Sequence, residues 1–275
     1  MYNIWLHPNN LEEEQNHNDP KARKDYSEAK SYRPISLTPF LFKTLERLCF
    51  WHSYETALTA MPIHERQHAY RPGYSTESAI SQVIDKIEQG LLKKSFTLSA
   101  YIDIASAFDK LSSTKATEAL RRRGISNDIV NWYGNYLKNR YAIIEIKGIK
   151  TQRLITTGCP QGGVLSTMLW SIAFDDLLKL FDDHEVSCTG YADDGSLLIC
   201  GNNLEHLYTQ MNDALAKCQQ WAESYGLGIS VEKTSYMIST NKKRKSFKIP
   251  NQGIHINNNQ IESCLLYTSP SPRDS

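Results

Sequence analysis

The sequence predicts an α+β fold in which helices pack on an antiparallel sheet. Amphipathic stretches with helical spacing and β-rich hairpins follow one another in irregular order, without the regular strand–helix alternation that a parallel sheet requires. The chain of 275 residues is long enough to bury a core, as one large domain or as two interleaved subdomains. Its apolar fraction of 40% and charged fraction of 22% are ordinary for a globular protein.

Composition excludes several classes of protein but selects none. No apolar run is long enough to cross a bilayer and no signal peptide follows Met1, so we expect an intracellular protein of the nucleus or cytoplasm without a membrane partner. Six scattered cysteines without a C-x-x-C pair predict reduced thiols and no zinc finger. The net charge is +1, and only two local basic runs stand out, at 121–123 and 242–245.

Two helices are predicted in the first hundred residues. Thr38 and Pro39 fit the N-cap and first position of a helix that runs to about Thr59. Ser75 can cap a second helix. The apolar residues of this second helix share one face: Ala79, Ile80, Val83, Ile84 and Ile87. The polar segment 1–30 is expected to be poorly ordered.

Four more helices are predicted, over 113–124, 126–139, 162–181 and 204–226. Ser113 and Ser126 cap the first two, glycines end the first and the last, and the third is apolar throughout. The last helix carries an apolar stripe of Leu204, Leu207, Met211, Leu215 and Cys218.

Four β-rich stretches complete the pattern. Residues 95–104 form a strand that ends on an acid, and "YAIIEIKGIKTQRLIT" is a hairpin turning near Lys147–Gly148. "GYADDGSLLIC", residues 190–200, is a hairpin with two adjacent acids in its turn, and residues 228–240 are another strand pair.

The acids at the ends of these strands are the first candidates for chemistry. Asp103 ends one β-rich run, and Asp193 and Asp194 lie in the turn of another. Aspartate suits strands poorly, and two adjacent carboxylates repel each other, so either a plain turn or a metal site explains them. If the strands are neighbours, the carboxylates can hold two Mg²⁺ ions roughly 4 Å apart. For either segment alone, the turn is the better explanation.

Six motifs taken in order resemble the reverse transcriptases of non-LTR retrotransposons, over roughly 32–240. The motifs are "YRPISLTPFLFKTLERL", "QHAYRPGYSTESAI", "DIASAFD", "GCPQGGVLST", "YADD" and "WAESYGLGISVEKT". Several ordered motifs make the resemblance specific where one would not.

The resemblance implies a right-hand polymerase with fingers at 31–96 and 124–157 and a palm at 97–123 and 158–262. Its antiparallel palm sheet would pack on helices. We find no "YLGV"-like primer grip, helical thumb or upstream endonuclease, so we expect a fragment of a larger polyprotein that extends primers poorly. The Ser/Pro-rich residues 263–275 are expected to be a non-native tail.

Carried over residue by residue, the resemblance makes Asp103, Asp193 and Asp194 the catalytic, metal-binding acids, with Asp194 the least direct ligand. They would hold two Mg²⁺ ions, for which Mn²⁺ is a substitute. Lys233, in "VEKT", would protonate the leaving pyrophosphate. Arg33, in "YRPI", would clamp the triphosphate. The alternative for Lys233, as for any lone lysine, is a solvated position on the surface.

Three further residues are implied to bind the nucleotide. Phe108 would exclude a 2′-hydroxyl by its bulk, and Gln161 and Gly162 of "PQGG" would lie along the incoming nucleotide. The alternative for Phe108 is a position in the core. The alternative for Gln161 and Gly162 is a plain loop-to-helix transition. This chain has Gly163 and Thr167 where the family more often has Ser and Pro.

The implied activity is RNA-directed DNA synthesis, with an RNA template, a DNA primer and dNTP as partners; the sequence does not define the oligomeric state. Three alternatives are an RNA-dependent RNA polymerase, a group II intron-like maturase, and a decayed or domesticated RNA-binding remnant without catalysis. The presence of Asp103, Asp193 and Asp194 argues against loss of chemistry. The two basic runs are candidate contacts to the nucleic-acid backbone.

Overall fold

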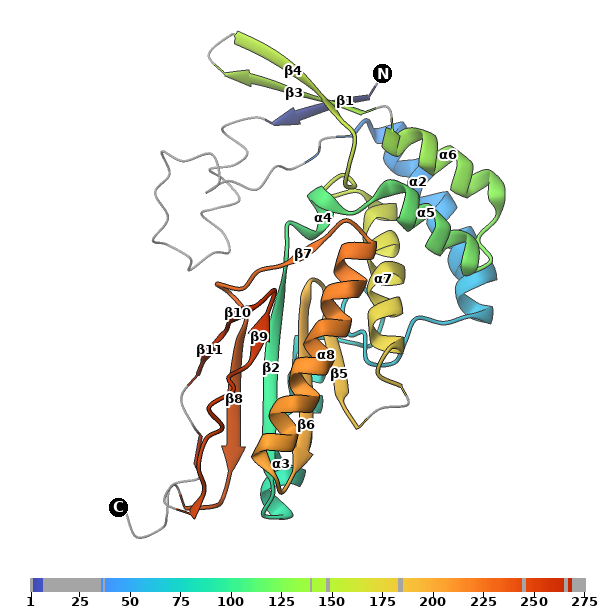
Figure 1. Ribbon diagram of the computed structural model, residues 1–275. Coiled ribbons are helices and arrows are strands. Elements are labelled where there is room, and N and C mark those ends of the chain that lie inside the picture. The colour runs from blue at the N-terminus through green and yellow to red at the C-terminus, as the bar shows by residue number, and fades with distance from the viewer. Residues whose placement is uncertain are drawn as a thin grey trace. The chain divides into compact units, whose positions relative to one another are not determined.

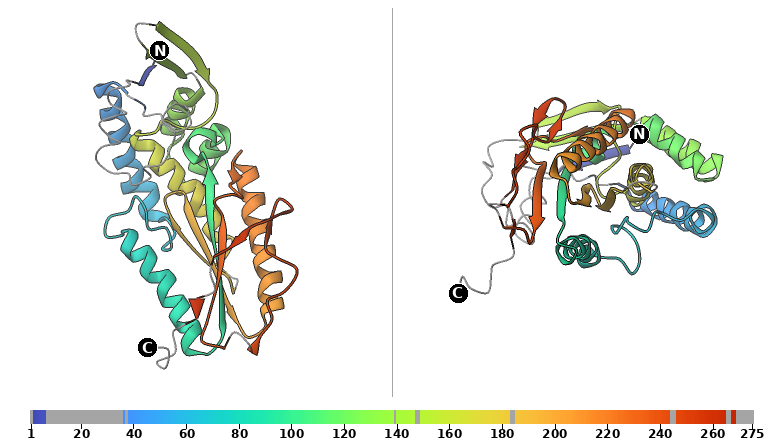
Figure 2. Two further views of the ribbon diagram at one scale, coloured as in Figure 1. Left: turned by 90° about the vertical axis from the view of Figure 1, so that its left-hand side faces the viewer. Right: turned by 60° about the horizontal axis from the view of Figure 1, so that its bottom comes forward.

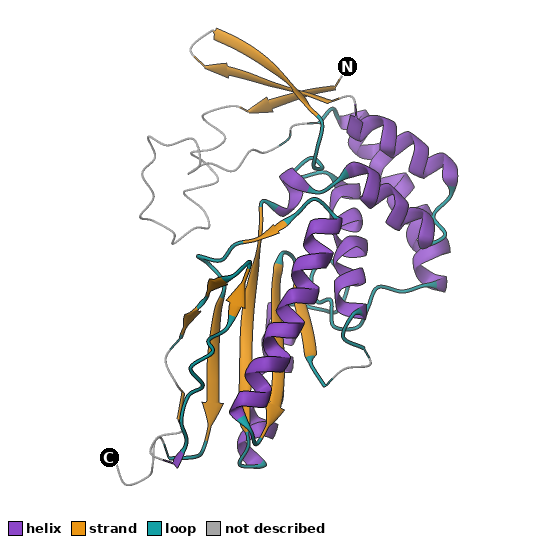
Figure 3. Cartoon of the chain, in the orientation of Figure 1, coloured by secondary structure: helices purple, strands orange, loops and turns teal. Residues whose placement is uncertain are grey.

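The structure is a computed structural model (Figure 1). It describes residues 2–6, 36, 38–138, 140–146, 149–182, 185–243, 246–264 and 267–268. Helices and mostly antiparallel strands follow each other in irregular order, which confirms the predicted α+β class (Figure 3). None of the helices in these residues is both long and apolar enough to cross a bilayer.

Contacts divide the chain into two compact units, each discontinuous in sequence. Unit 1 comprises Met1–Pro62 and Phe108–Leu169, and unit 2 comprises Ile63–Ala107 and Trp170–Ser275. The fingers and palm ranges expected from the sequence cut the chain at other residues and stay a prediction.

Unit 2 is built on a seven-stranded sheet in which β2 is central, in the order β11–β8–β2–β6–β5. Strands β7 and β12 pair with β2 and β8, and β9 and β10 form a separate ribbon. The strand bounds are β2 Phe96–Ala105, β5 Ser187–Tyr191, β6 Asp194–Gly201, β7 Gly228–Ile229, β8 Ser235–Thr240, β9 His255–Ile256, β10 Asn259–Gln260, β11 Glu262–Ser263 and β12 Tyr267–Thr268. The expected pairing within 228–240 is wrong, because β7 and β8 each run antiparallel to β2 and not to each other.

Helices α3 (Thr76–Leu92) and α8 (Leu204–Ser224) lie against opposite faces of this sheet (Figure 2). Ser75 caps α3 as predicted, in a reciprocal capping box with Ser78. The stripe predicted for α8 is buried throughout. The apolar face predicted for α3 is not, since Ile80 and Ile84 are 57% and 46% exposed. Helical spacing shows which residues share a face, but not whether another element covers that face.

Unit 1 contains most of the remaining helices. They are α2 Phe40–Ser53, the π-helical η2 Tyr54–Leu58, α5 Ser113–Arg122 and α6 Asn127–Lys138; α4 Ala107–Lys110 and α7 Val164–Lys179 cross the boundary between the units. Two predicted caps are wrong by one residue, because Pro39 and Ser112 have non-helical backbone angles and precede their helices. Ser126 accepts a hydrogen bond from the Ile129 N–H, as expected of a cap.

Unit 1 also contains a small sheet of β1 Tyr2–Leu6, β3 Arg140–Ile146 and β4 Ile149–Ile155. The predicted hairpin is confirmed as β3–β4, and its turn at Lys147–Gly148 lies outside the described residues. Strand β1 pairs with β3 although it belongs to the segment expected to be poorly ordered.

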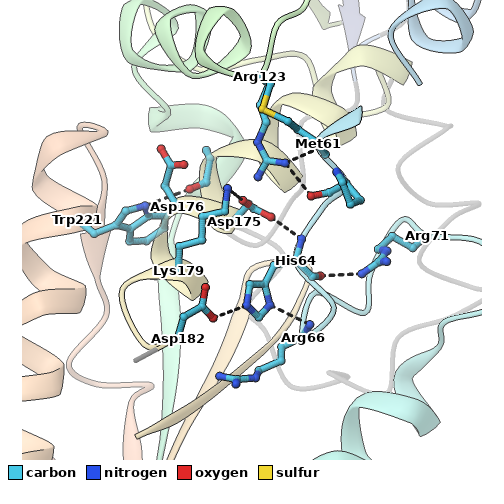
Figure 4. A network of polar contacts seen from close by, with 12 residues as sticks. Met61, His64, Arg66, Arg71, Arg123, Asp175, Asp176, Lys179, Asp182 and Trp221 are labelled. Carbon is cyan, nitrogen blue, oxygen red and sulfur yellow. Dashed lines mark hydrogen bonds and ion pairs between the residues drawn. The ribbon is translucent and has the colours of Figure 1, made fainter. Parts of the chain in front are cut away.

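The basic run 121–123 does not form one surface. Arg123 is only 4% exposed, and its guanidinium donates to the backbone carbonyls of Met61 and Pro62 at 2.8 Å (Figure 4). The expectation that Arg123 contacts nucleic acid is therefore wrong, because its charge is used to satisfy buried backbone acceptors. Arg121 is exposed and donates to the Asn131 side chain. In the second run, residues 244 and 245 lie outside the described residues.

The hairpin β5–β6 is packed against the ring of Phe174, which is fully buried. Gly190 lies over this ring, and a Cβ atom at Gly190 would come within 2.3 Å of it. The glycine before "YADD" is therefore required by close packing.

Gly190→Ala is expected to lower the free energy of unfolding by about 1–3 kcal/mol, because the added methyl group overpacks the ring of Phe174. Gly228→Ala is the matched control, since nothing lies within 4 Å of a Cβ there. Urea denaturation of both variants measures the difference. Equal stability of the two would show that Phe174 does not pack under the hairpin.

Arg123→Met is expected to cost about 2 kcal/mol of stability, because two carbonyls lose a charged donor. Arg121→Met removes an exposed guanidinium and should change stability by less than about 0.5 kcal/mol. Thermal and chemical unfolding compare the two. A loss of similar size in both would contradict the buried role of Arg123.

Candidate active site

The predicted acids meet at one end of the sheet in unit 2. Strands β2 and β6 are antiparallel neighbours, and their register sets Asp103 directly opposite Asp194. Directly opposite residues project their side chains from the same face of a sheet, with Cβ atoms about 5 Å apart. Asp193 lies in the adjoining turn and is exposed. The structure thus brings Asp103 next to a pair of acids that lies 90 and 91 positions later in the sequence.

The turn that carries Asp193 has only two residues, because Tyr191 pairs with Asp194. Ala192 has a φ of 54°, the sign required at the first central position of a type II′ turn. The left-handed region costs a residue with a Cβ about 1 kcal/mol or more. The buried indole of Trp170 donates to the Ala192 carbonyl at 2.7 Å and helps to hold this conformation.

A second turn holds the backbone of Asp103. The Ser230 N–H donates to the Asp103 carbonyl at 2.9 Å, and the Asp103 N–H donates to the Thr234 hydroxyl at 3.4 Å. This arrangement places Lys233 beside the acid, with Nζ 3.4 Å from Asp103 Oδ1. Lys233 is 69% exposed, so the ion pair adds little stability but keeps a movable cation next to the carboxylate. Thr234, in "VEKT", has no such role in the prediction from the sequence.

The donor set suits a hard cation. Asp103 and Asp194 offer only carboxylate oxygens, which Mg²⁺ prefers and usually supplements with water and phosphate oxygens. Within the described part of the chain, no three His, Cys, Asp or Glu side chains form a ready metal cluster. The paired carboxylates are the kind of donor that fits Mg²⁺.

A groove of ≈ 620 Å³ opens beside these acids. One wall is the exposed apolar face of α3, with Ile80 and Ile84, and the other is the sheet. Asp103, Asp194 and Lys233 all line the groove. The acids are therefore accessible to a ligand of substantial size.

The loop that leads to α3, residues 61–75, was not predicted to have a structural role. His64 fastens it to α7: its N–H donates to Asp175, and its Nδ1 accepts from the Arg66 N–H at 3.0 Å (Figure 4). Because Nδ1 is an acceptor, Nε2 carries the proton and donates to Asp182 at 2.6 Å.

This loop supports the edge of the hairpin. The Gly190 N–H donates to the Arg66 carbonyl, and the His68 N–H donates to the Gly190 carbonyl, each at 2.9 Å. The motif "QHAYRPGYSTESAI" contains His68 and begins directly after Arg66, but its pattern predicts no partner strand.

The predicted nucleotide-binding residues lie in unit 1. Gln161 is held at both ends, because its carbonyl accepts from the Ser36 N–H at 3.0 Å and its Nε2 donates to Asp109 Oδ1 at 3.2 Å. Gly162 is exposed, with a φ of 90°. Asp109, next to Phe108, thus orients the amide of the "PQGG" loop.

Phe108 is half-buried on the short helix α4. Its carbonyl accepts from the Cys159 N–H at 2.7 Å, which joins the α4 backbone to the segment before Gln161. Arg33 lies outside the described residues.

The family model "Reverse transcriptase (RNA-dependent DNA polymerase)" matches residues 19–256. The chain is 25% identical over 228 residues to the RNA-directed DNA polymerase from the mobile element jockey of Drosophila melanogaster, covering 81% of this chain and 25% of the relative. It is 26% identical over 212 residues to the Pol polyprotein from the type-1 retrotransposable element R1 of Bradysia coprophila, covering 77% and 21%. The chain spans about a quarter of the length of these relatives.

Solved structures support the fold. The apo telomerase from Candida tropicalis, truncated from its C-terminal domain, superposes with a TM-score of 0.56 at 15% identity, covering 75% of this chain and 48% of that one. Telomerase from the same organism with a telomeric RNA fragment gives 0.54 at 14% identity, covering 83% and 37%. The chain belongs to the reverse transcriptase family, and its curated relatives are polymerases of non-LTR retrotransposons.

Proposed function

We propose that this chain carries the polymerisation centre of a non-LTR retrotransposon reverse transcriptase, which joins dNTP to a primer 3′ end on an RNA template. The register that sets Asp103 opposite Asp194, with Asp193 in the adjoining turn, carries the proposal. The groove gives substrate access to these acids. The partners are an RNA template, a DNA primer and dNTP.

Asp103, Asp193 and Asp194 would hold two Mg²⁺ ions, with Mn²⁺ as a substitute. Bound Mg²⁺ would activate the primer 3′-hydroxyl and offset the charge that develops on the phosphates. The relative importance of Asp193 and Asp194 as ligands stays a prediction.

The other residues act on the nucleotide. Lys233 exchanges its contact with Asp103 for the leaving pyrophosphate and donates a proton to it. Gln161 and Gly162 would lie along the incoming nucleotide, Phe108 would limit room at the 2′ position, and Arg33 would clamp the triphosphate. Exposed Arg121 remains a candidate contact to the nucleic-acid backbone.

No observation favours a maturase or a non-catalytic remnant. The relatives are polymerases of mobile elements, and the acids, the turn that carries them and the groove beside them are all present. A remnant would have no need to maintain the strained turn at Ala192.

Asp103→Asn and Asp193→Asn are each expected to reduce incorporation of a single dNTP on a primed RNA by about a thousandfold, because the loss of a metal ligand removes several kcal/mol of transition-state stabilisation. Single-turnover assays with Mg²⁺ measure the rate without requiring processive extension. Asp213→Asn, an exposed acid on α8, is the control and should retain full activity. Incorporation that survives at Asp103→Asn would disprove the site.

Phe108→Ala is expected to raise the ratio of NTP to dNTP incorporation by at least about tenfold, because removal of the ring gives room for a 2′-hydroxyl. Phe108→Tyr retains the bulk and should retain the preference for dNTP. Competition assays on one primed RNA measure the ratio. An unchanged ratio in Phe108→Ala would assign Phe108 to the core alone.

A further inference from the structure

A buried acid in unit 1 has no role in the chemistry described above. Glu46 lies on the buried face of α2, four residues after Phe42, and is 0% exposed. Neither of its carboxylate oxygens makes a fully formed hydrogen bond in the structure. An acid in such a position is strongly unfavourable unless other groups compensate for the loss of water.

The compensating groups are at the start of α7. Burial raises the pKa of Glu46, while the backbone N–H groups of Val164 and Leu165 lower it in part. The carboxylate also lies close to Gly163, since a Cβ atom there would be 3.2 Å from Glu46 Oε1. Glu46 thus faces the first free N–H groups of the helix, where the positive end of its dipole lies.

Gly163 immediately precedes helix α7 and has no side chain that could accept from the following N–H groups. An added Cβ would meet Ser166 Oγ at 2.7 Å as well as Glu46 Oε1. A side chain at position 163 and the carboxylate of Glu46 therefore compete for the same space.

We propose that Glu46 is a positioning residue for the Gln161–Gly163 loop, which it holds by capping α7 from a different helix. The Ser36 N–H bonds to the Gln161 carbonyl at the start of this loop, and Glu46 faces the helix at its end. The segment 36–46 thus contacts both ends of the loop. The effect on nucleotide binding rests on the proposed function, whereas the cap does not.

The cap is tested without any assay of activity. Glu46→Ala should increase hydrogen exchange at the Val164 and Leu165 amides by about tenfold, because they lose the carboxylate that faces them. Glu46→Gln retains an acceptor oxygen and should show a smaller increase. Glu55→Ala, an exposed acid in η2, is the control and should show none.

A rescue experiment separates capping from packing. Gly163→Ser alone should destabilise the protein, because its Cβ would lie 2.7 Å from Ser166 Oγ and 3.2 Å from Glu46 Oε1, although the backbone there allows any residue. In Glu46→Ala the space is free and the Ser166 hydroxyl can rotate, so adding Gly163→Ser should restore slow exchange at Val164 and Leu165. Strictly additive effects on exchange and on the urea midpoint would overturn the proposal.

Nucleotide binding tests the positioning. Glu46→Ala should raise the KM for dNTP by about tenfold with little change in kcat, and the double variant should restore it. An unchanged KM despite faster exchange would overturn the positioning role. If the parent chain incorporates no dNTP, the proposed function fails, and equilibrium binding of dNTP to the same variants replaces KM.

Discussion

The active end of unit 2 depends on the register between β2 and β6. A slip of one residue would turn Asp103 to the opposite face of the sheet from Asp194 and separate the acids. The register is specified from several directions, because β8 pairs with the other edge of β2 and the ring of Phe174 packs under β5 and β6. The position of the carboxylates is thus set by packing some distance away from them.

The supporting contacts are made to the backbone on either side of the acids. Trp170 bonds to the carbonyl of Ala192, the turn at Ser230 bonds to the backbone of Asp103, and the loop at Arg66 bonds to that of Gly190. Like charges at the strand ends are tolerated because their side chains face solvent and the groove. Bound cations would offset the repulsion between these carboxylates. Rigid backbone with accessible carboxylates is the arrangement a metal-dependent enzyme requires.

Local patterns predicted the elements well, and long-range partners were the main source of error. The cap at Ser75, the stripe of α8 and the acids in a hairpin each depend on neighbours in the chain. Arg123 was taken for a surface charge, because no pattern shows that the carbonyls of Met61 and Pro62 lie beside it. Glu46 was overlooked for the same reason, although an acid on the apolar side of a helix was a usable signal.

Unit 1 holds its loops in a different way from unit 2. Buried charged side chains act as partners for backbone groups of these loops, in addition to backbone bonds such as that from the Ser36 N–H to the Gln161 carbonyl. Arg123 satisfies the carbonyls at 61–62, and Arg140, 2% exposed, donates to those of Thr157 and Gly158 at 2.8 and 2.6 Å. Glu46 does the same for N–H groups at the start of α7. A buried charge that serves as a backbone partner cannot be exchanged for an uncharged residue of equal size. Substitution of Glu46, Arg123 or Arg140 should therefore lower the stability of the protein more than substitution of the acids of the active site. For catalysis the order should be the reverse.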